Sequence, residues 1–137
     1  MRWVANASFA AALFLPDETS SAARRFFSGL KPADEVWVPS LWWYEITNVL
    51  IIAERRKRIT PVDTTKIISL YYQLNLETDT LSGTKYSGRL YEIAKTCNLT
   101  AYDAAYLELA MRKEAGLATL DKKLVKAVNL SGVHLFR

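Results

Sequence analysis

The stretch that decides the fold is Leu99 to Leu124, LTAYDAAYLELAMRKEAGLATLDKKL. It predicts a helix, a tight turn, a short buried strand and the start of a second helix. Thr100 is a favourable N-cap, and Asp103 three residues later completes a capping-box pattern. Gly116 is expected to stop the helix. The apolar run Leu117 to Leu120 is typical of a parallel strand, which is buried on both faces of its sheet.

Two carboxylates in this stretch fall where sites form in open α/β sheets. Asp103 lies in the first turn of the helix, and Asp121 directly follows the strand, where it can cap the helix that begins with Lys122. Each acid taken alone is explained by a capping role. The carboxyl edge of a parallel sheet is also the edge at which ligands bind. Further polar side chains at that edge would therefore turn two caps into a site.

The composition predicts one folded domain over residues 1–137. Half of the residues are hydrophobic, and a chain of 137 residues can bury a sizeable core. The net charge of +4 permits a nucleic-acid partner without requiring one. The single cysteine, Cys97, excludes a disulfide framework and a cysteine-based zinc site. Together these features suggest a reducing, cytoplasmic setting.

The N-terminal sequence MRWVANASFAAALFLP loosely resembles a signal peptide, with Arg2 as its charged start and Phe9 to Leu15 as its apolar core. Asn6 and Ser8 interrupt this pattern, and no set of cysteines downstream would benefit from export. We favour the alternative interpretation, a strand followed by a helix that ends near Pro16. No stretch is long and apolar enough to predict a membrane-spanning helix.

Strands and helices are expected to alternate along the chain. Strands are predicted at about 2–5, 35–38, 76–78, 117–120 and 133–136. Helices are predicted at about 8–15, 19–30, 41–56, 61–74, 85–97, 101–111 and from 122 onward, with Ser40 and Thr60 at two of their starts. Such alternation implies right-handed crossovers and a parallel sheet covered by helices on both faces. The predicted class is therefore a three-layer α/β/α fold.

Glu45 is a third acid that needs an explanation. Apart from Tyr44, it is the only ionisable side chain over 41–53. A helix that is apolar nearly all round is expected to be buried, and a lone carboxylate there is costly unless a partner stabilises it. Either Glu45 reaches solvent or bonds Ser40 or a backbone amide, or it is a metal ligand or catalytic acid in a cleft. Asn48 lies one turn later on the same helical face.

Four side chains fall at the same sheet edge in this fold: Asn6, Glu45, Asp103 and Asp121. They follow the ends of strands or lie in the first turns of the helices that come next. Carboxylates gathered at one place repel one another, which raises and couples their pKa values. A divalent cation removes that penalty, and oxygen ligands without His or Cys nearby select Mg²⁺ or Mn²⁺. The pattern therefore predicts a metal site.

Four segments resemble the PIN-domain ribonucleases of the VapC toxin type, in the same order and over nearly the whole chain: WVANASFAAALFLPDE, VPSLWWYEITNVL, LTAYDAAYLELA and LATLDKKL. The resemblance implies an α/β/α sandwich around a parallel sheet of order 3-2-1-4-5. It implies a Mg²⁺- or Mn²⁺-dependent endoribonuclease that a VapB-type antitoxin neutralises. Carried over by position, the resemblance gives three acids, two hydroxyl positions near the metal and one polar position beside the acids: Glu45, Asp103 and Asp121, then Ser8 and Thr119, then Asn48.

The first acidic position departs from that family. The family pattern at the end of the first strand is V-x-D-A-S, whereas this chain reads Val4-Ala5-Asn6-Ala7-Ser8. Asn keeps a carbonyl oxygen but loses the negative charge that attracts a hard cation. We expect weak metal affinity and little or no cleavage. Two explanations are open: an inactivating substitution, selected or intentional, because an active toxin harms its host, or a naturally silent member of the family.

The implied mechanism is metal-assisted hydrolysis of an RNA phosphodiester. The acids would hold one or two cations, and a bound water would attack the phosphorus in line. Ser8 and Thr119 would hold the carboxylates in position.

Positive charge near this edge would bind the RNA backbone. The candidates are a dense cluster at a helix end and a group close in sequence to Asp121: Arg55, Arg56, Lys57 and Arg58, then Lys122, Lys123 and Lys126. The dense cluster is also explained as a solvated helix end. Trp42, Trp43 and Tyr44 could stack on bases or bind a partner helix, but core or dimer contacts explain most of them more simply. His134, on the last predicted strand, is given no catalytic role.

The main functional hypothesis is a VapC-like RNA-cleaving toxin weakened at Asn6. The alternative is a catalytically silent PIN-fold module that binds RNA or protein, and a more remote one is a DNA-directed nuclease of the same fold. Restoring the acid with Asn6→Asp separates the first two. The expected partners are RNA, a VapB-type antitoxin and a second copy of the chain in a homodimer.

Overall fold

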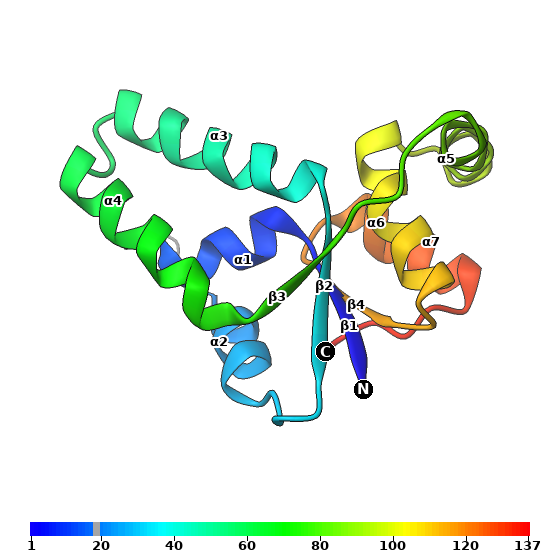
Figure 1. Ribbon diagram of the computed structural model, residues 1–137, viewed down its shortest axis with the longest axis horizontal. Helices are drawn as coiled ribbons and strands as arrows, with labels where there is room; N and C mark the ends of the chain where they lie inside the picture. The colour runs from blue at the N-terminus through cyan, green and yellow to red at the C-terminus, as the bar shows by residue number, and fades with distance from the viewer. Residues whose placement is uncertain (18–19) are drawn as a thin grey trace.

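A parallel sheet lies between two layers of helices in the computed structural model, which describes residues 1–17 and 20–137 (Figure 1). Over these residues its strands are β1 (Arg2–Ala5), β2 (Glu35–Pro39), β3 (Leu76–Asp79) and β4 (Gly116–Ala118). The strand order is β3-β2-β1-β4 and every pairing is parallel. The α/β/α class and the 3-2-1-4 part of the expected order are therefore confirmed.

The helices divide between the two faces of the sheet, as Figure 1 shows with the sheet nearly edge-on. One side carries α1 (Ala7–Phe14), α2 (Ser21–Ser28), α3 (Leu41–Arg55) and α4 (Pro61–Leu70), and the 3₁₀ helix η1 (Tyr71–Leu74) leads into β3. The other side carries α5 (Thr84–Cys97), α6 (Ala101–Arg112) and α7 (Lys122–Ser131). The start predicted at residue 19 for the second helix lies outside the described residues.

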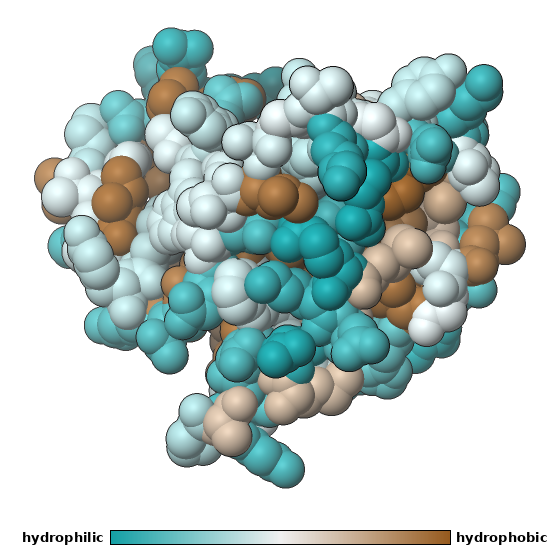
Figure 2. Space-filling view, turned by 45° about the vertical axis from the view of Figure 1, so that its right-hand side comes forward, coloured by the Kyte–Doolittle hydropathy of each residue, from teal (hydrophilic) through white to brown (hydrophobic). Residues whose placement is uncertain are grey.

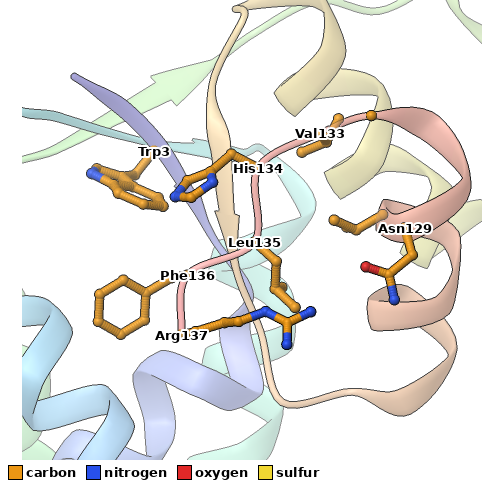
Figure 3. Close-up of a pocket in the computed structure, with 9 residues that line it drawn as sticks. Trp3, Asn129, Val133, His134, Leu135, Phe136 and Arg137 are labelled. Atoms are coloured by element: carbon orange, nitrogen blue, oxygen red, sulfur yellow. The ribbon is translucent and has the colours of Figure 1, made fainter.

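The fifth predicted strand, 133–136, is reduced to one parallel bridge between Leu117 and Leu135. The backbone N–H of Leu117 donates to the His134 carbonyl at 2.8 Å, and the N–H of Phe136 donates to the Leu117 carbonyl at 3.0 Å. Because β4 has only three residues, it has little room for a longer ladder. The Phe136 ring instead packs edge-to-face on Trp3, with ring centroids 5.7 Å apart, which anchors the C-terminal segment (Figure 3).

The sequence predicted that Gly116 would stop α6, and this prediction is wrong. The helix ends at Arg112, and Glu114 takes the left-handed conformation of the turn with a φ of 51°. Gly116 is the first residue of β4 and lies against the ring of Trp3. A Cβ at position 116 would lie 2.5 Å from Cζ3 of Trp3, so close packing explains this glycine. The strand ends at Ala118, two residues before the predicted end.

The helix α3 is buried along one stripe and not all round, contrary to the prediction. Tyr44, Ile51 and Ile52 lie at the surface. The buried side chains follow the three- and four-residue spacing of one helical face: Trp42, Ile46, Leu50 and Ala53. The single stripe explains how Glu45 can sit in a largely apolar helix and still border solvent.

Thr60 and Pro61 open α4 as predicted, and Asp63 completes a capping box with Thr60. The helix predicted to continue to residue 74 changes at Leu70 into η1, and Asn75 ends that turn in the left-handed conformation with a φ of 48°.

The surface of the molecule is mixed. On the face shown in Figure 2, hydrophobic residues form separate islands among hydrophilic ones. Of the helices in the described ranges, none combines the length and the apolar character that crossing a bilayer requires.

Candidate active site

The carboxyl ends of the strands meet at one edge of the sheet, as predicted. Asn6 directly follows β1, Asp79 ends β3, and Asp121 caps the helix after β4. Glu45 and Asp103 stand near the starts of α3 and α6, which begin at the same edge. The fold thus places the predicted side chains at the edge where ligands bind in sheets of this kind.

Asn6 is buried and serves as the N-cap of α1. Its Oδ1 accepts a hydrogen bond from the backbone N–H of Ser8 at 2.9 Å and another from the Ser8 hydroxyl at 2.6 Å. Since both partners are donors, the carbonyl oxygen of the amide must face Ser8. The amide nitrogen, which can only donate, therefore points away from the cap. Asn6 as it stands offers no spare oxygen to a cation.

Glu45 has a partner that the sequence analysis did not identify. The hydroxyl of Tyr106 donates to Oε1 of Glu45 at 2.5 Å. Tyr106 is completely buried in α6. Ser40 and a backbone amide were the donors named in one of the two alternatives for Glu45, and in the described structure the hydrogen bond comes from Tyr106 instead. The available signal was the position of Tyr106, one turn after Asp103 on the same helical face.

The pKa values show that the acids lie close enough to affect one another. Burial raises the pKa of Glu45, the hydrogen bond from Tyr106 opposes that rise, and the charge of Asp103 adds to it. Burial also raises the pKa of Asp103, and the charge of Asp121 adds to this rise. The three carboxylates therefore form a chain of neighbours that runs from Glu45 through Asp103 to Asp121.

Asp121 and Asp103 both keep carboxylate oxygens outside their capping bonds. Oδ1 of Asp121 accepts from the N–H of Leu124 at 2.9 Å, which leaves Oδ2 outside the cap. Thr119 is buried, and its Oγ1 accepts from the N–H of Asp121 at 3.0 Å, which holds the backbone of that acid. At α6 the Thr100 hydroxyl accepts from the N–H of Asp103, but the return bond of a full capping box is not formed in the described structure.

The donor set suits a hard cation, because it consists of oxygen atoms without nearby His or Cys. Within residues 1–17 and 20–137, however, no three Asp, Glu, His or Cys side chains are grouped tightly enough to hold one ion. The acids adjoin in pairs, and the position next to them holds Asn6 with its oxygen engaged. The residues therefore fit Mg²⁺ or Mn²⁺ in their chemistry, but the acids of the described structure do not form a three-ligand site.

The other predicted side chains are divided between the site and distant surfaces. Asn48 is exposed one turn after Glu45. Arg55 lies ten residues beyond Glu45, or about 15 Å along α3, so the basic cluster at that helix end is not brought to the acids. Within that cluster Arg58 binds Asp17 through two bonds of 2.6 and 2.8 Å.

Lys122 and Lys123, both exposed, are better placed for a phosphate backbone than that basic cluster. They open α7 directly after Asp121, and the charge of Lys123 lowers the pKa of Asp103 against the two effects that raise it. His134 lies beside Trp3, with ring centroids 5.5 Å apart, which agrees with giving it no catalytic role (Figure 3).

A buried ionic cluster at the end of β3 was also missed. Arg112 donates two bonds to the Asp79 carboxylate, at 2.6 and 3.1 Å, and its Nε donates to both oxygens of Glu108, at 2.6 and 3.3 Å. Ser40 does not cap α3 with its side chain; its hydroxyl donates to the Asp79 carbonyl at 2.9 Å. These hydrogen bonds connect the end of β3 to the start of α3 and to α6. The spacing of Glu108 and Arg112, four residues apart, was the available signal.

Known proteins are similar to this chain in sequence and in fold. The family model described as PIN domain matches residues 4–130. Ribonuclease VapC3 of Pyrobaculum aerophilum is 29% identical over 126 residues, which cover 92% of this chain and 94% of that protein. The crystal structure of PAE2754 from Pyrobaculum aerophilum matches this chain with a TM-score of 0.68 at 20% identity. The match covers 99% of this chain and 92% of the PAE2754 chain.

The crystal structure of VapBC2 from Rickettsia felis, bound to a DNA fragment from the VapBC2 promoter, matches this chain with a TM-score of 0.66 at 16% identity. The match covers 98% of this chain and 97% of the matched chain. At these identities the solved structures support the fold, whereas the family model spans nearly all of the sequence that builds the sheet and its acidic edge. This chain belongs to the PIN domain family.

Proposed function

We propose that this chain is a VapC-type endoribonuclease that uses Mg²⁺ or Mn²⁺, and that Asn6 weakens its chemistry. The observation that carries the proposal is the row formed by Glu45, Asp103 and Asp121: burial raises the pKa values of Glu45 and Asp103, and the charge of the next acid in the row adds to each rise. Crowded carboxylates at the ligand-binding edge of a sheet are expected where a cation offsets their repulsion. The similarity to a ribonuclease of the same family supports RNA as the substrate.

Each side chain of the site has a definable task in this reaction. Glu45, Asp103 and Asp121 would hold the cation, which when bound makes a water more acidic and neutralises charge on the phosphoryl oxygens. Tyr106 fixes the orientation of Glu45 through its 2.5 Å hydrogen bond. Thr119 fixes the backbone of Asp121. These two are positioning residues, because they act through the acids.

The weakness at position 6 follows from the hydrogen bonds of Asn6. An Asp there could accept both bonds from Ser8 with one oxygen and present its second oxygen to a cation. Asn presents an NH₂ group in place of that oxygen, so it withholds both a ligand and a negative charge. The N-cap itself is preserved in either case, since Asn and Asp cap helices about equally well.

The test is to compare the chain with its Asn6→Asp variant, measuring Mg²⁺ and Mn²⁺ binding by calorimetry and cleavage of total RNA. We expect metal affinity to rise at least about tenfold, because an added charge at about 4 Å is worth roughly 4 kcal/mol at an effective dielectric constant of 20. Cleavage should appear with it, and it should disappear again in Asn6→Asp/Glu45→Gln. Asn129→Asp adds the same charge on the exposed side of α7 and is the matched control. No gain beyond that control would refute the proposal.

A second candidate function is a catalytically silent module that binds RNA. The observation that favours it is the Asn6 amide, whose NH₂ group can donate to a phosphate oxygen without a metal. This candidate predicts that the unmodified chain binds single-stranded RNA in the presence of EDTA, and that Asn6→Asp weakens this binding without adding cleavage.

We also propose an antitoxin partner and a homodimer. VapBC2 from Rickettsia felis supports the first, because it shares the fold over nearly the full length of both chains. Co-expression with any small reading frame adjacent to the gene, followed by affinity purification and light scattering, tests both. We expect a complex with two copies of this chain, whereas separate elution of a monomer would contradict both expectations.

A further inference from the structure

A pocket of about 350 Å³ lies at the starts of the two helices that carry Glu45 and Asp103. It lies between the start of α3, the end of β3, the helix α5 and the first turn of α6. Two of its lining residues, Tyr44 and Tyr102, directly precede Glu45 and Asp103 in the sequence. The pocket and the acids therefore share the same two helix starts. Its size falls within the range of about 300–1,000 Å³ that is usual for small-ligand sites.

Three tyrosines define the character of this pocket. Tyr44 is 79% exposed and Tyr102 is 67% exposed, while Tyr86 is partly buried in its wall. In the described part of the chain, the rings of Tyr44 and Tyr102 stack on no other aromatic ring, and their hydroxyls form no hydrogen bond. Burying such a ring against a flat partner would therefore gain stacking energy without breaking an existing contact. Nucleobases offer that flat partner.

The charge around the pocket also suits a nucleotide, because the acid in its lining, Asp79, is paired with Arg112. On α5, Tyr86 and Leu90 line the pocket, and each is directly preceded by an exposed cation, Lys85 and Arg89. Because residues four apart share a helical face, these two cations form a stripe beside the lining stripe. A strand of RNA could thus place a base in the pocket and its phosphates along α5.

We propose that this pocket binds an unpaired nucleobase of RNA next to the phosphate held at the acids, stacked on Tyr44 and Tyr102. The inference rests on the proposed function, because it takes RNA as the substrate. It deepens that function by assigning the residues that would hold the base beside the bound phosphate; a base can enter the pocket only when it is unpaired and unstacked.

The test uses the chain as it is, with Asn6 in place, so that binding is measured without cleavage. The probe is a set of short single-stranded RNAs of mixed sequence that carry the fluorescent base 2-aminopurine at each position in turn. We expect one position to change in fluorescence on binding. Tyr102→Ala and Tyr44→Ala should each weaken binding about fivefold to a hundredfold, the range of base–aromatic stacking, whereas Tyr102→Phe should bind as before. Tyr91→Ala is the matched control, since Tyr91 is 64% exposed on α5 and outside the pocket.

Three results would overturn the inference. The first is absence of RNA binding by the unmodified chain, and the second is equal binding by Tyr102→Ala and Tyr91→Ala when circular dichroism shows both to be folded. The third is a change from dimer to monomer in Tyr44→Ala or Tyr102→Ala, which would mean that a second copy covers the pocket. Failure of the proposed nuclease function gives a different result: Asn6→Asp would cleave nothing while the tyrosine variants still lost RNA affinity.

Discussion

Replacing Arg112 with Met would remove the cation that neutralises two carboxylates in the interior. Glu108 is completely buried and Asp79 nearly so, and Arg112 holds both through four charge-assisted bonds of 2.6 to 3.3 Å. Met fills much of the same volume without a charge. The variant would therefore keep most of the packing and leave two carboxylates without their cation.

The expected cost follows from the burial of the cluster. Removing one partner of a buried ion pair usually costs about 3–5 kcal/mol, because the remaining charge is left in a poorly solvated place. The Arg112 side chain is 21% exposed, so water can partly solvate the site and the lower end of this range applies. A loss of about 3 kcal/mol is a large share of the roughly 5–15 kcal/mol that stabilises a typical domain.

Urea unfolding followed by circular dichroism measures this loss. Arg2→Met is the matched control, because Arg2 pairs with Glu35 at 3.2 Å with side chains 51% and 46% exposed, and such surface pairs contribute about 1 kcal/mol or less. Arg112→Lys should fall between the two, since Lys cannot make the two-pronged bond to Asp79. If Arg112→Met destabilises the chain no more than Arg2→Met does, the cluster is not the support described above.

Three further predictions concern packing and titration. Gly116→Ala should destabilise the chain by about 1–3 kcal/mol in urea, because the added Cβ meets the Trp3 ring, whereas Gly88→Ala, with open space at its Cβ in α5, should stabilise it by about 0.5–1 kcal/mol. Tyr106→Phe removes the hydrogen bond that lowers the pKa of Glu45, so NMR of the carboxyl carbon should show that pKa rising further. Burial keeps the pKa of Glu45 above its ordinary 4.5, so the native chain binds more protons than the unfolded one above that pH. Stability should therefore fall as pH rises through the raised pKa, and Glu45→Gln should remove this part of the decline in a series of unfolding curves.

The elements that were predictable are those whose signal is local. Thr60 and Pro61 gave the start of α4, and the alternation of apolar runs with helical spacing gave the parallel sheet. The role of Asp121 as the N-cap of α7 was also predictable, because capping depends on a few neighbouring residues. The position of the acids at the carboxyl edge of the sheet was then predictable from the order of strands and helices, without knowledge of any side-chain contact.

The contacts that were missed join residues far apart in the sequence. Nothing local to Glu45 points to Tyr106, which is 61 residues away, and nothing local to Asp79 points to Arg112, which is 33 residues away. The last predicted strand failed for a similar reason, since the three residues of β4 allow only one bridge to Leu135. Pairing length depends on the partner strand, which the pattern of the strand itself does not reveal.

Position 6 combines a fold requirement and a chemical requirement in one side chain, and Asn meets only the first. The Oδ1 atom caps α1 whether the residue is Asn or Asp, so folding alone places little constraint on the choice. An Asp there would add a carboxylate beside Glu45 and Asp103, whose pKa values burial and neighbouring charge already raise. We therefore expect Asn6→Asp to be less stable than the unmodified chain in EDTA.

Mg²⁺ should reverse that loss, because an ion that binds only the folded state stabilises it by about 2.7 kcal/mol at a concentration one hundred times its dissociation constant. The unmodified chain should respond much less, since Asn6 has no oxygen to give. The measurement is urea unfolding of both proteins with EDTA and with Mg²⁺. Equal midpoints for Asn6→Asp in the two conditions would mean that the added carboxylate does not face the acidic row, and the account of Asn6 would then be wrong.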